Sequence, residues 1–197
     1  SDKFGRICLG CVNENSQWIR PMKPDGFLEK EIIMDNGKMI RLFDVVDTKF
    51  GFSCPISEYK ENIYFAPGTE MKFVRNLDET QRSSLLQKIA DANILDIVKT
   101  KDELYHLLSA KLARSLILAG PINRFEIDKT MGHHPRIWLL DQQTGQRLFF
   151  VRCTDLKFCK FLETKPEIFK ENNGVVSSQN IPELNGKQMY FVVGLTG

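Results

Sequence analysis

Residues 136–153 read RIWLLDQQTGQRLFFVRC, two apolar-rich runs separated by a polar stretch that contains a glycine. The runs 136–141 and 147–153 have the length and the β-branched and aromatic content of strands. The residues between them, Gln142 to Gly145, favour a turn. The stretch therefore predicts a β-hairpin. Because side chains alternate between the two faces of a strand, Arg136 and Trp138 should share a face.

The first part of the chain repeats this order of segments. Residues 6–12 begin with Arg-Ile and form an apolar-rich run, 13–16 form a polar turn cluster, and 17–20 end in arginine. We expect Pro21 and Pro24 to end this strand, since proline has no N–H to donate to a ladder. A repeated order of this kind favours two related lobes.

A second hairpin of the first lobe is predicted around Asp35-Asn36-Gly37. Asn-Gly tolerates the positive φ angles of a short turn, so residues 31–34 and 38–46 should flank it as strands. Residues 71–74 supply a further strand that closes this lobe.

The middle of the chain changes to a helical period. Residues 80–92 place leucine and isoleucine at helical spacing, and Thr100 to Glu103 form a capping-box pattern. A leucine stripe follows from Leu104 to Leu116, and we expect Gly120-Pro121 to end this second helix.

Strand character returns after the helices. Besides the hairpin at 136–153, the pattern predicts a short helix at 165–171, capped by Asn173-Gly174, and a last strand at 188–195. The fold class expected is mainly β with an α-helical pair (β+α): two tandem OB-like small β-barrels bridged by helices. The expected domains are an OB-like lobe one at 1–77, a helical bridge or insert at 78–120 and an OB-like lobe two at 121–197.

Composition limits the function classes. The chain has 197 residues, 42% of them hydrophobic, and a net charge of +2, which lacks the basic excess of a dedicated duplex binder. No membrane-length apolar stretch and no leader pattern occur, so we expect a cytoplasmic protein. The five cysteines are an odd number, typical of reduced thiols rather than of a disulfide framework.

The sequence holds no strong metal or catalytic signature. Cys8 and Cys11 have the spacing of half a zinc site but no second pair, and a strand would send them to opposite faces. Asp44 and Asp47 would likewise face opposite ways in a strand. No nucleophile elbow or phosphate loop is present. We therefore expect no metal, no cofactor and no catalytic residues, and a function other than catalysis.

The most suggestive pattern is an aromatic residue beside a cation. Trp18 and Arg20 are two apart in one expected strand, as are Arg136 and Trp138. Such pairs bind single-stranded nucleic acid when bases stack on the rings and the cations contact phosphates. The alternative is that the tryptophans fill cores and the arginines cover them. The expected ligand-binding residues are Arg6, Trp18, Arg20, Arg41, Arg136, Trp138, Arg147, Arg152 and Lys157.

Four short segments resemble the dual OB-fold (DuOB) proteins of bacteria and archaea. The segments are 5–10 (GRICLG), 17–21 (QWIRP), 151–158 (VRCTDLKF) and 192–196 (VVGLT). The resemblance implies two OB-like barrels that bind nucleic acid or a nucleotide-like ligand, and it implies no catalytic residues. The OB fold also serves oligosaccharide and protein ligands.

Two functions follow as expectations. The first is a non-enzymatic binding module for single-stranded DNA or RNA, or for a nucleotide. The alternative is a protein-interaction or accessory scaffold module that serves a separate effector, which the balanced charge and the leucine-rich helices favour. An enzyme, either a nuclease or a zinc-dependent hydrolase, is the third candidate, and no membrane partner is expected.

Overall fold

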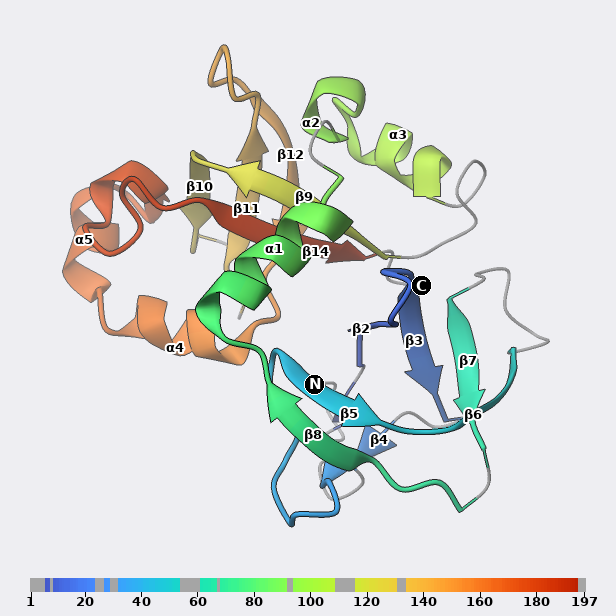
Figure 1. The fold of residues 1–197 in the computed structure, drawn as a ribbon. Coiled ribbons are helices and arrows are strands. Elements are labelled where there is room, and N and C mark those ends of the chain that lie inside the picture. Colours follow the sequence, from blue (N-terminus) through green and yellow to red (C-terminus); the bar gives the residue numbers. More distant parts are fainter. Residues whose placement is uncertain are drawn as a thin grey trace. The chain divides into compact units, whose positions relative to one another are not determined.

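The computed structural model describes residues 6–7, 9–23, 27–28, 32–53, 61–66, 68–91, 94–108, 116–130 and 134–194. The chain divides into two compact units. Unit 1 comprises Ser1–Ile89 with Leu108–Leu116, and unit 2 comprises Ala90–Leu107 with Ile117–Gly197. Both are mostly β with helices, which confirms the expected fold class (Figure 1).

Unit 1 consists of short strands and one helix, α1 (Glu79–Ile89), within the described part of the chain. Its largest sheet has the order β2-β3-β7-β6, and β5-β8 and β1-β4 are two-stranded. The strands are β1 (Arg6–Ile7), β2 (Cys11–Val12), β3 (Trp18–Met22), β4 (Phe27–Leu28), β5 (Asp44–Asp47), β6 (Phe50–Ser53), β7 (Asn62–Phe65) and β8 (Lys72–Asn76).

The strand β3 continues through Pro21, so the prediction that this proline ends it was wrong. The backbone N–H of Arg20 donates to the carbonyl of Glu61 at 2.7 Å, on the side of β7. The nitrogen of the next residue therefore points to the opposite side. There β2 has ended, since its register reaches only as far as Cys11 opposite Ile19. The ladder needs no donor at Pro21, and proline is tolerated.

The turn at Asp35-Asn36-Gly37 is confirmed, while its flanking strands are shorter than expected. Met34 N–H donates to the Lys38 carbonyl at 2.8 Å, and Gly37 has φ 73°. The chain then turns again at Phe43, with φ 67°, before β5 begins at Asp44. The strand expected at 38–46 is therefore divided. Met39 forms an isolated β-bridge with Ile33, and β5 is a separate strand. Ile32, Met34 and Met71 form the buried cluster of unit 1.

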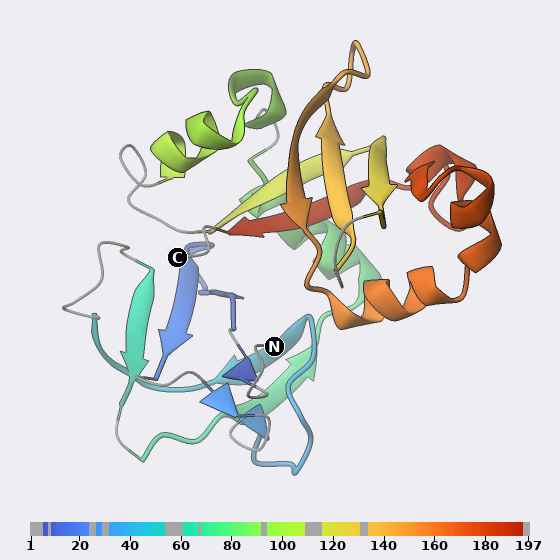
Figure 2. The ribbon, with the colours of Figure 1, turned by 180° about the vertical axis from the view of Figure 1, so that it is seen from behind.

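Unit 2 contains the sheet β12-β11-β10-β13 and the pair β14-β9. In Figures 1 and 2, α2 and α3 lie at one end of this unit and α4 and α5 at the other. The elements are α2 (Ile94–Ile97), α3 (Lys101–His106), β9 (Leu116–Ile122), β10 (Phe125–Asp128), β11 (Arg136–Leu140), β12 (Arg147–Arg152), α4 (Leu156–Glu163), α5 (Pro166–Glu171), β13 (Val175–Ser177) and β14 (Met189–Gly194).

The predicted hairpin at 136–153 is confirmed as β11 and β12. Its turn begins at Asp141, whose carboxylate accepts from the backbone N–H groups of Gln143 at 3.0 Å and Thr144 at 2.9 Å. Gly145 has φ 76°, and a Cβ there would collide with the guanidinium group of Arg124. Glycine adopts this φ without strain, and any other residue would also require the flexible Arg124 side chain to move.

Among the described residues the leucine stripe is helical only from Leu104 to Leu108, and residues 109–115 lie outside the described part of the chain. The capping box is confirmed, with Thr100 accepting from Glu103 N–H at 3.1 Å, but α3 ends at His106. Leu116 to Gly120-Pro121 belong to β9 instead, which corrects the predicted helix end. Residues 117–120 are all buried. A run that is buried on both faces shows no hydrophobic periodicity, so its sequence does not distinguish a strand from a helix.

Two further predicted elements are present in the structure, and the predicted bridge is divided. The helix α5 is followed by Asn173 and Gly174, with φ 52° and 82°, as the pattern predicted. The last strand is present as β14. The expected bridge at 78–120 is divided between the compact units, with α1 in unit 1 and α2 and α3 in unit 2. The domain limits 1–77 and 121–197 remain predictions.

The core of unit 2 lies under one face of its sheet. Ile127, Ile137 and Leu139 are 0–1% exposed, and they alternate with residues that face the other way. Leu162 of α4 and Ile181 are also fully buried. Complete burial of such side chains stabilises a domain by about 1.5–3 kcal/mol each.

Truncation of one core side chain should therefore destabilise unit 2. Ile127→Ala removes a fully buried side chain and leaves a cavity, with an expected loss of about 2–5 kcal/mol. The matched control is Ile97→Ala in α2, where the side chain is 67% exposed and the expected change is within about 0.5 kcal/mol. Chemical denaturation followed by circular dichroism measures both, and equal losses would contradict the assigned core.

Candidate functional site

The face of the β10-β11-β12 sheet opposite the core carries the expected aromatic and cationic residues. The strand register sets Glu126, Trp138 and Phe150 in one cross-strand row. The neighbouring row holds Asp128, Arg136 and Arg152. We call these six residues, together with Arg147, the outer face of unit 2.

The two rings of the outer face contact each other and each lies beside a guanidinium group. Trp138 and Phe150 meet edge to face, with ring centroids 5.1 Å apart at 64°. Arg147 Cζ lies 5.0 Å from the Trp138 ring centroid, and Arg136 Cζ lies 4.6 Å from that of Phe150. Both rings are half-buried. The arrangement combines aromatic and cation–π contacts in one layer.

A register shift explains how Arg147 reaches this face. Strict alternation from buried Phe149 would send Arg147 to the core side. Between Leu139 and Leu140 the register with β12 shifts, so that Leu140 lies opposite Arg147. This bulge re-aims the side chain. Arg147 Nε then lies 2.6 Å from Glu126 Oε2, in an ion pair on the outer face.

Asp128 anchors the edge of Trp138. Its Oδ1 accepts from the backbone N–H and the hydroxyl of Thr130, and its Oδ2 accepts from Trp138 Nε1 at 3.4 Å. Burial alone would raise the pKa of Asp128. The hydrogen bonds from Thr130 and Trp138 and the charge of Arg136 outweigh it and hold that pKa below its usual value. A carboxylate at this position orients the indole ring.

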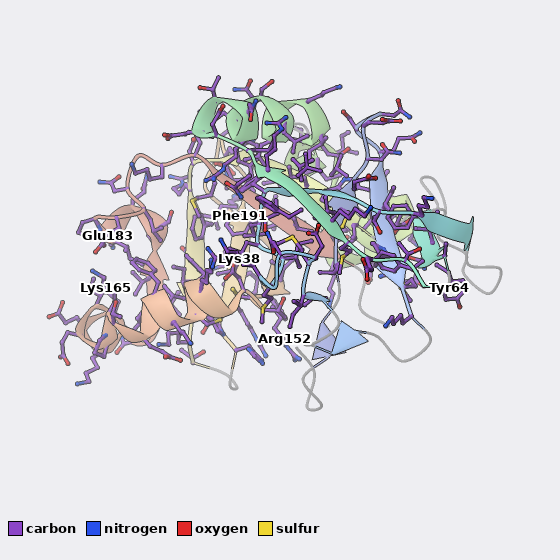
Figure 3. All side chains as sticks on the ribbon, turned by 60° about the horizontal axis from the view of Figure 1, so that its bottom comes forward. Lys38, Tyr64, Arg152, Lys165, Glu183 and Phe191 are labelled. Atoms are coloured by element: carbon purple, nitrogen blue, oxygen red, sulfur yellow. The ribbon has the colours of Figure 1, made fainter. Side chains whose placement is uncertain are left out.

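Arg152 belongs to this face, and Lys157 lies on the helix that follows β12. Arg152 is exposed at the end of β12 (Figure 3). The strand register sets it directly opposite Arg136. Like charges at directly opposed positions repel, and an anion between them relieves that repulsion. Lys157 is exposed in the first turn of α4. The Asp155 carboxylate caps this helix, accepting from Lys157 N–H at 2.8 Å and Phe158 N–H at 2.9 Å.

The tryptophan of unit 1 is placed differently. Trp18 is half-buried, and a Cβ added at Gly10 would lie 3.5 Å from its Cζ3 atom and from Leu116 Cδ1. Trp18 Nε1 is buried and has no hydrogen-bond partner within the described residues. The ring thus packs inside unit 1.

The three predicted arginines of unit 1, Arg6, Arg20 and Arg41, lie in different segments of that unit. Arg20 Nε donates to Asn62 Oδ1 at 2.7 Å, and Asn62 is only 4% exposed. Arg41 is exposed in the turn before β5, where its backbone N–H donates to Asp44. Arg6 lies in β1, and its side chain is outside the described residues. As ligand-binding residues, Arg6, Trp18, Arg20 and Arg41 remain predictions.

No metal centre forms among the residues that the structure describes, where no three His, Cys, Asp or Glu side chains cluster. Cys8 lies outside those residues, and Cys11 is a free thiol whose pKa burial raises to about 11. No described helix is long and apolar enough to cross a membrane.

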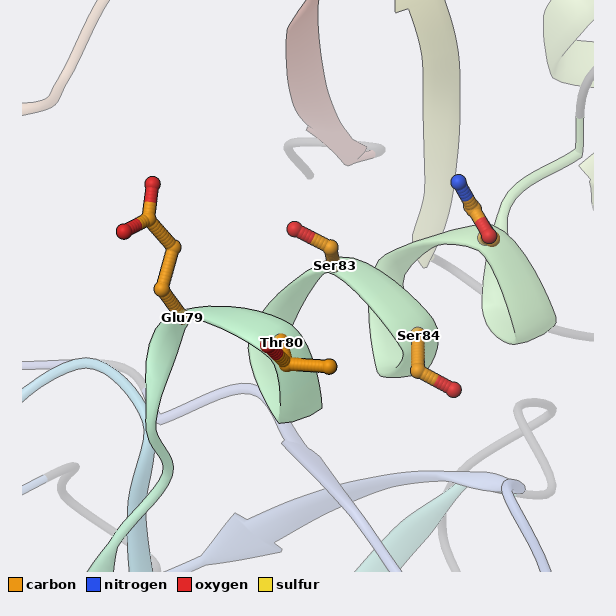
Figure 4. Close-up of a pocket in the computed structure, with 5 residues that line it drawn as sticks. Glu79, Thr80, Ser83 and Ser84 are labelled. Atoms are coloured by element: carbon orange, nitrogen blue, oxygen red, sulfur yellow. The ribbon is translucent and has the colours of Figure 1, made fainter.

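A shallow hollow on α1 does not gather chemical groups from different elements. Glu79, Thr80, Ser83, Ser84 and Gln87 line it, and all five belong to this one helix. Figure 4 shows Glu79, Thr80, Ser83 and Ser84 projecting from this helix in different directions. In a typical ligand site, groups from several elements converge. The outer face of unit 2 is therefore the stronger candidate.

The model of one protein family, described as the dual OB-containing domain, matches residues 1–189 of the chain. The match covers nearly the whole sequence, so the chain belongs to the dual OB-containing domain family. It confirms the resemblance seen in the sequence and indicates an OB-fold binding module in general. No curated protein and no solved structure shows significant similarity to the chain.

The lowered pKa of Asp128 predicts an acid-sensitive contribution to folding. The folded state favours the carboxylate, so this contribution is complete above the unfolded pKa of about 4 and is lost as pH falls through the lower folded value. Asp128→Asn should lower the free energy of unfolding at pH 7. It should also weaken the decrease of that free energy on acidification.

Urea denaturation between about pH 6 and about pH 2 measures both effects. The control is Asp96→Asn, which removes an exposed carboxylate from α2 of the same unit. If Asp128→Asn and Asp96→Asn have the same effect, Asp128 has no special role in holding Trp138.

Proposed function

We propose that this member of the dual OB-containing domain family is a non-enzymatic module that binds single-stranded nucleic acid or a nucleotide on the outer face of unit 2. The observation that carries the proposal is the half-buried Trp138, held against Phe150 with guanidinium groups beside both rings. Bases stack on such rings, and the cations contact phosphates.

The geometry favours a stacking ligand because the Trp138 ring is held from several sides. Phe150 meets it edge to face, and Asp128 accepts from its Nε1. A held ring loses little conformational freedom on binding, which favours affinity. A base that stacks on an aromatic side chain contributes about 1–3 kcal/mol.

The charges of the outer face suit phosphate groups. Arg136 and Arg152 stand on adjacent strands at opposed positions, and guanidinium groups bind phosphate through two parallel hydrogen bonds. Arg147 lies on the same face, and Lys157 is an exposed cation on α4 of the same unit. Glu126 and Asp128 offset part of this charge, so stacking rather than net charge would supply specificity.

A protein-interaction or accessory scaffold module serving a separate effector is the second candidate. The described part of the leucine stripe offers little support, because Leu104 and Leu108 are 4% and 0% exposed. Support comes from β8, whose residues are all exposed, among them Phe73 at 37% and Val74 at 54%. An apolar pair on an exposed strand suits a protein partner.

Tryptophan fluorescence tests the stacking role directly, because the chain has 2 tryptophans, Trp18 and Trp138. In a Trp18→Phe variant, Trp138 is the remaining tryptophan, and its emission is excited selectively at wavelengths that tyrosine does not absorb. A single-stranded oligonucleotide pool should then quench the emission, since the bases stack on that ring. The matched variant Trp138→Phe keeps Trp18, and its emission should stay unchanged.

Fluorescence anisotropy of the labelled oligonucleotides at low salt gives the affinity in the same variants. Trp138→Ala should weaken binding by about tenfold, the equivalent of about 1.4 kcal/mol. Absence of binding by the native protein to single-stranded DNA, single-stranded RNA and mononucleotides would overturn the proposed function. Binding lost in Trp18→Phe but kept in Trp138→Ala would move the site to unit 1.

Arg152 tests the phosphate contact separately. For a single strand, each phosphate contact contributes about −0.7 to the slope of log affinity against log salt. Arg152→Gln should therefore make that slope less steep by about 0.7. Lys170→Gln is the charge-matched control, since Lys170 is exposed on α5 and pairs with Glu167. Equal changes in both variants would mean that only net charge matters.

A further inference from the structure

Two cysteines of unit 2 lie next to each other in space. Cys153 directly follows the last residue of β12, and Cys159 is the fourth residue of α4. Their Sγ atoms are 4.0 Å apart, and Cys159 Sγ lies 3.9 Å from the Cys153 carbonyl oxygen. Both thiols are free and half-buried.

Backbone contacts hold the two cysteines in this relation. Cys153 N–H donates to the carbonyl of Pro135 at 2.9 Å, which attaches the end of β12 to the start of β11. The Asp155 side chain begins α4 two residues later, and Cys159 N–H donates to the Asp155 carbonyl at 2.9 Å. These bonds hold Cys153, after the end of β12, close to Cys159 in α4.

We propose that Cys153 and Cys159 form a dithiol modification site, which closes to an intramolecular disulfide on reaction with a small-molecule disulfide such as oxidised glutathione. A disulfide bond measures about 2.05 Å, so the sulfur atoms must approach by about 2 Å. Rotation about the Cα–Cβ bonds moves a sulfur atom over such distances between staggered positions.

The reaction takes place in two exchanges. The Cys159 thiolate attacks one sulfur of oxidised glutathione, forms a mixed disulfide and releases one glutathione thiolate. The Cys153 thiolate then attacks the Cys159 sulfur, forms the internal disulfide and releases the second glutathione. Two cysteine thiols are oxidised, and one glutathione disulfide is reduced to two thiols, which take up the two protons that the cysteines lose.

The order of attack follows from the surroundings of the thiols. Burial raises the pKa of Cys153, chiefly through loss of hydration, and its thiolate is disfavoured before the mixed disulfide forms. Once Cys159 carries glutathione, the neighbouring position of Cys153 makes its attack intramolecular. The high local concentration then favours closure over a second, separate glutathione adduct.

Trypsin offers a direct readout, because Arg152, Lys157 and Lys160 place the two cysteines in separate peptides, 153–157 and 158–160. The full native chain is equilibrated with mixtures of reduced and oxidised glutathione, free thiols are alkylated, and peptides are identified by mass spectrometry. The expected product is the 153–157 peptide linked to 158–160. Its equilibrium constant should be about tenfold or more higher in the native chain than in urea.

Variants separate this pair from the other thiols. Cys11→Ser should leave the linked peptide unchanged, and Cys159→Ser should abolish it and yield a glutathione adduct or a free Cys153. Equal equilibrium constants in native and urea-unfolded chains would overturn the proposal. So would two separate glutathione adducts, or linkage of either cysteine to Cys8, Cys11 or Cys54 in its place.

Discussion

The alternation of side chains across β10, β11 and β12 is the constraint on which the rest of unit 2 depends. Ile127, Ile137 and Leu139 are buried at 0–1% exposure on one face. Each of these strands has a period of two, so burying them sends their neighbours to the opposite face. A slip of one residue would place Trp138 in the core and Ile137 in solvent. The hydrophobic core thus determines which residues form the outer face.

Patterns with a clear period predicted this part of the chain well. The alternating run at 136–153 gave the correct hairpin, and the position of Arg136 and Trp138 on one face followed from their spacing. The helix predicted through the leucine stripe to Gly120-Pro121 was right at Leu104 to His106 and wrong at Leu116 to Gly120, which form a strand. Residues 117–120 are all buried, and a run buried on both faces fits a strand as well as a helix. The prediction at Pro21 failed too, since a proline is excluded from a strand only where the ladder requires its missing donor.

Three features of the structure depend on contacts between residues that are brought together by the fold, and the sequence pattern did not predict them. Trp18 and Trp138 each have an arginine two residues away, yet one packs against Gly10 and the other against Phe150 and Asp128. The contribution of Arg147 depends on a register shift between β11 and β12. The contact between Cys153 and Cys159 depends on where α4 begins, and the sequence pattern did not predict that helix. Each of these features arises from tertiary contacts and not from the spacing of residues in the sequence.

Under the proposed function, the charges of the outer face suit a charged ligand even though the chain is nearly neutral. Glu126 pairs with Arg147, and Asp128 lies opposite Arg136, so two of the three arginines on the face already have an acidic neighbour. Long duplexes are held by many phosphate contacts and require a cationic excess. A ligand with few phosphates and an exposed base needs only a ring to stack on and one or two guanidinium groups. Under the proposed function, Glu126 and Asp128 therefore limit the range of ligands that the outer face can bind to nucleotides and short single strands.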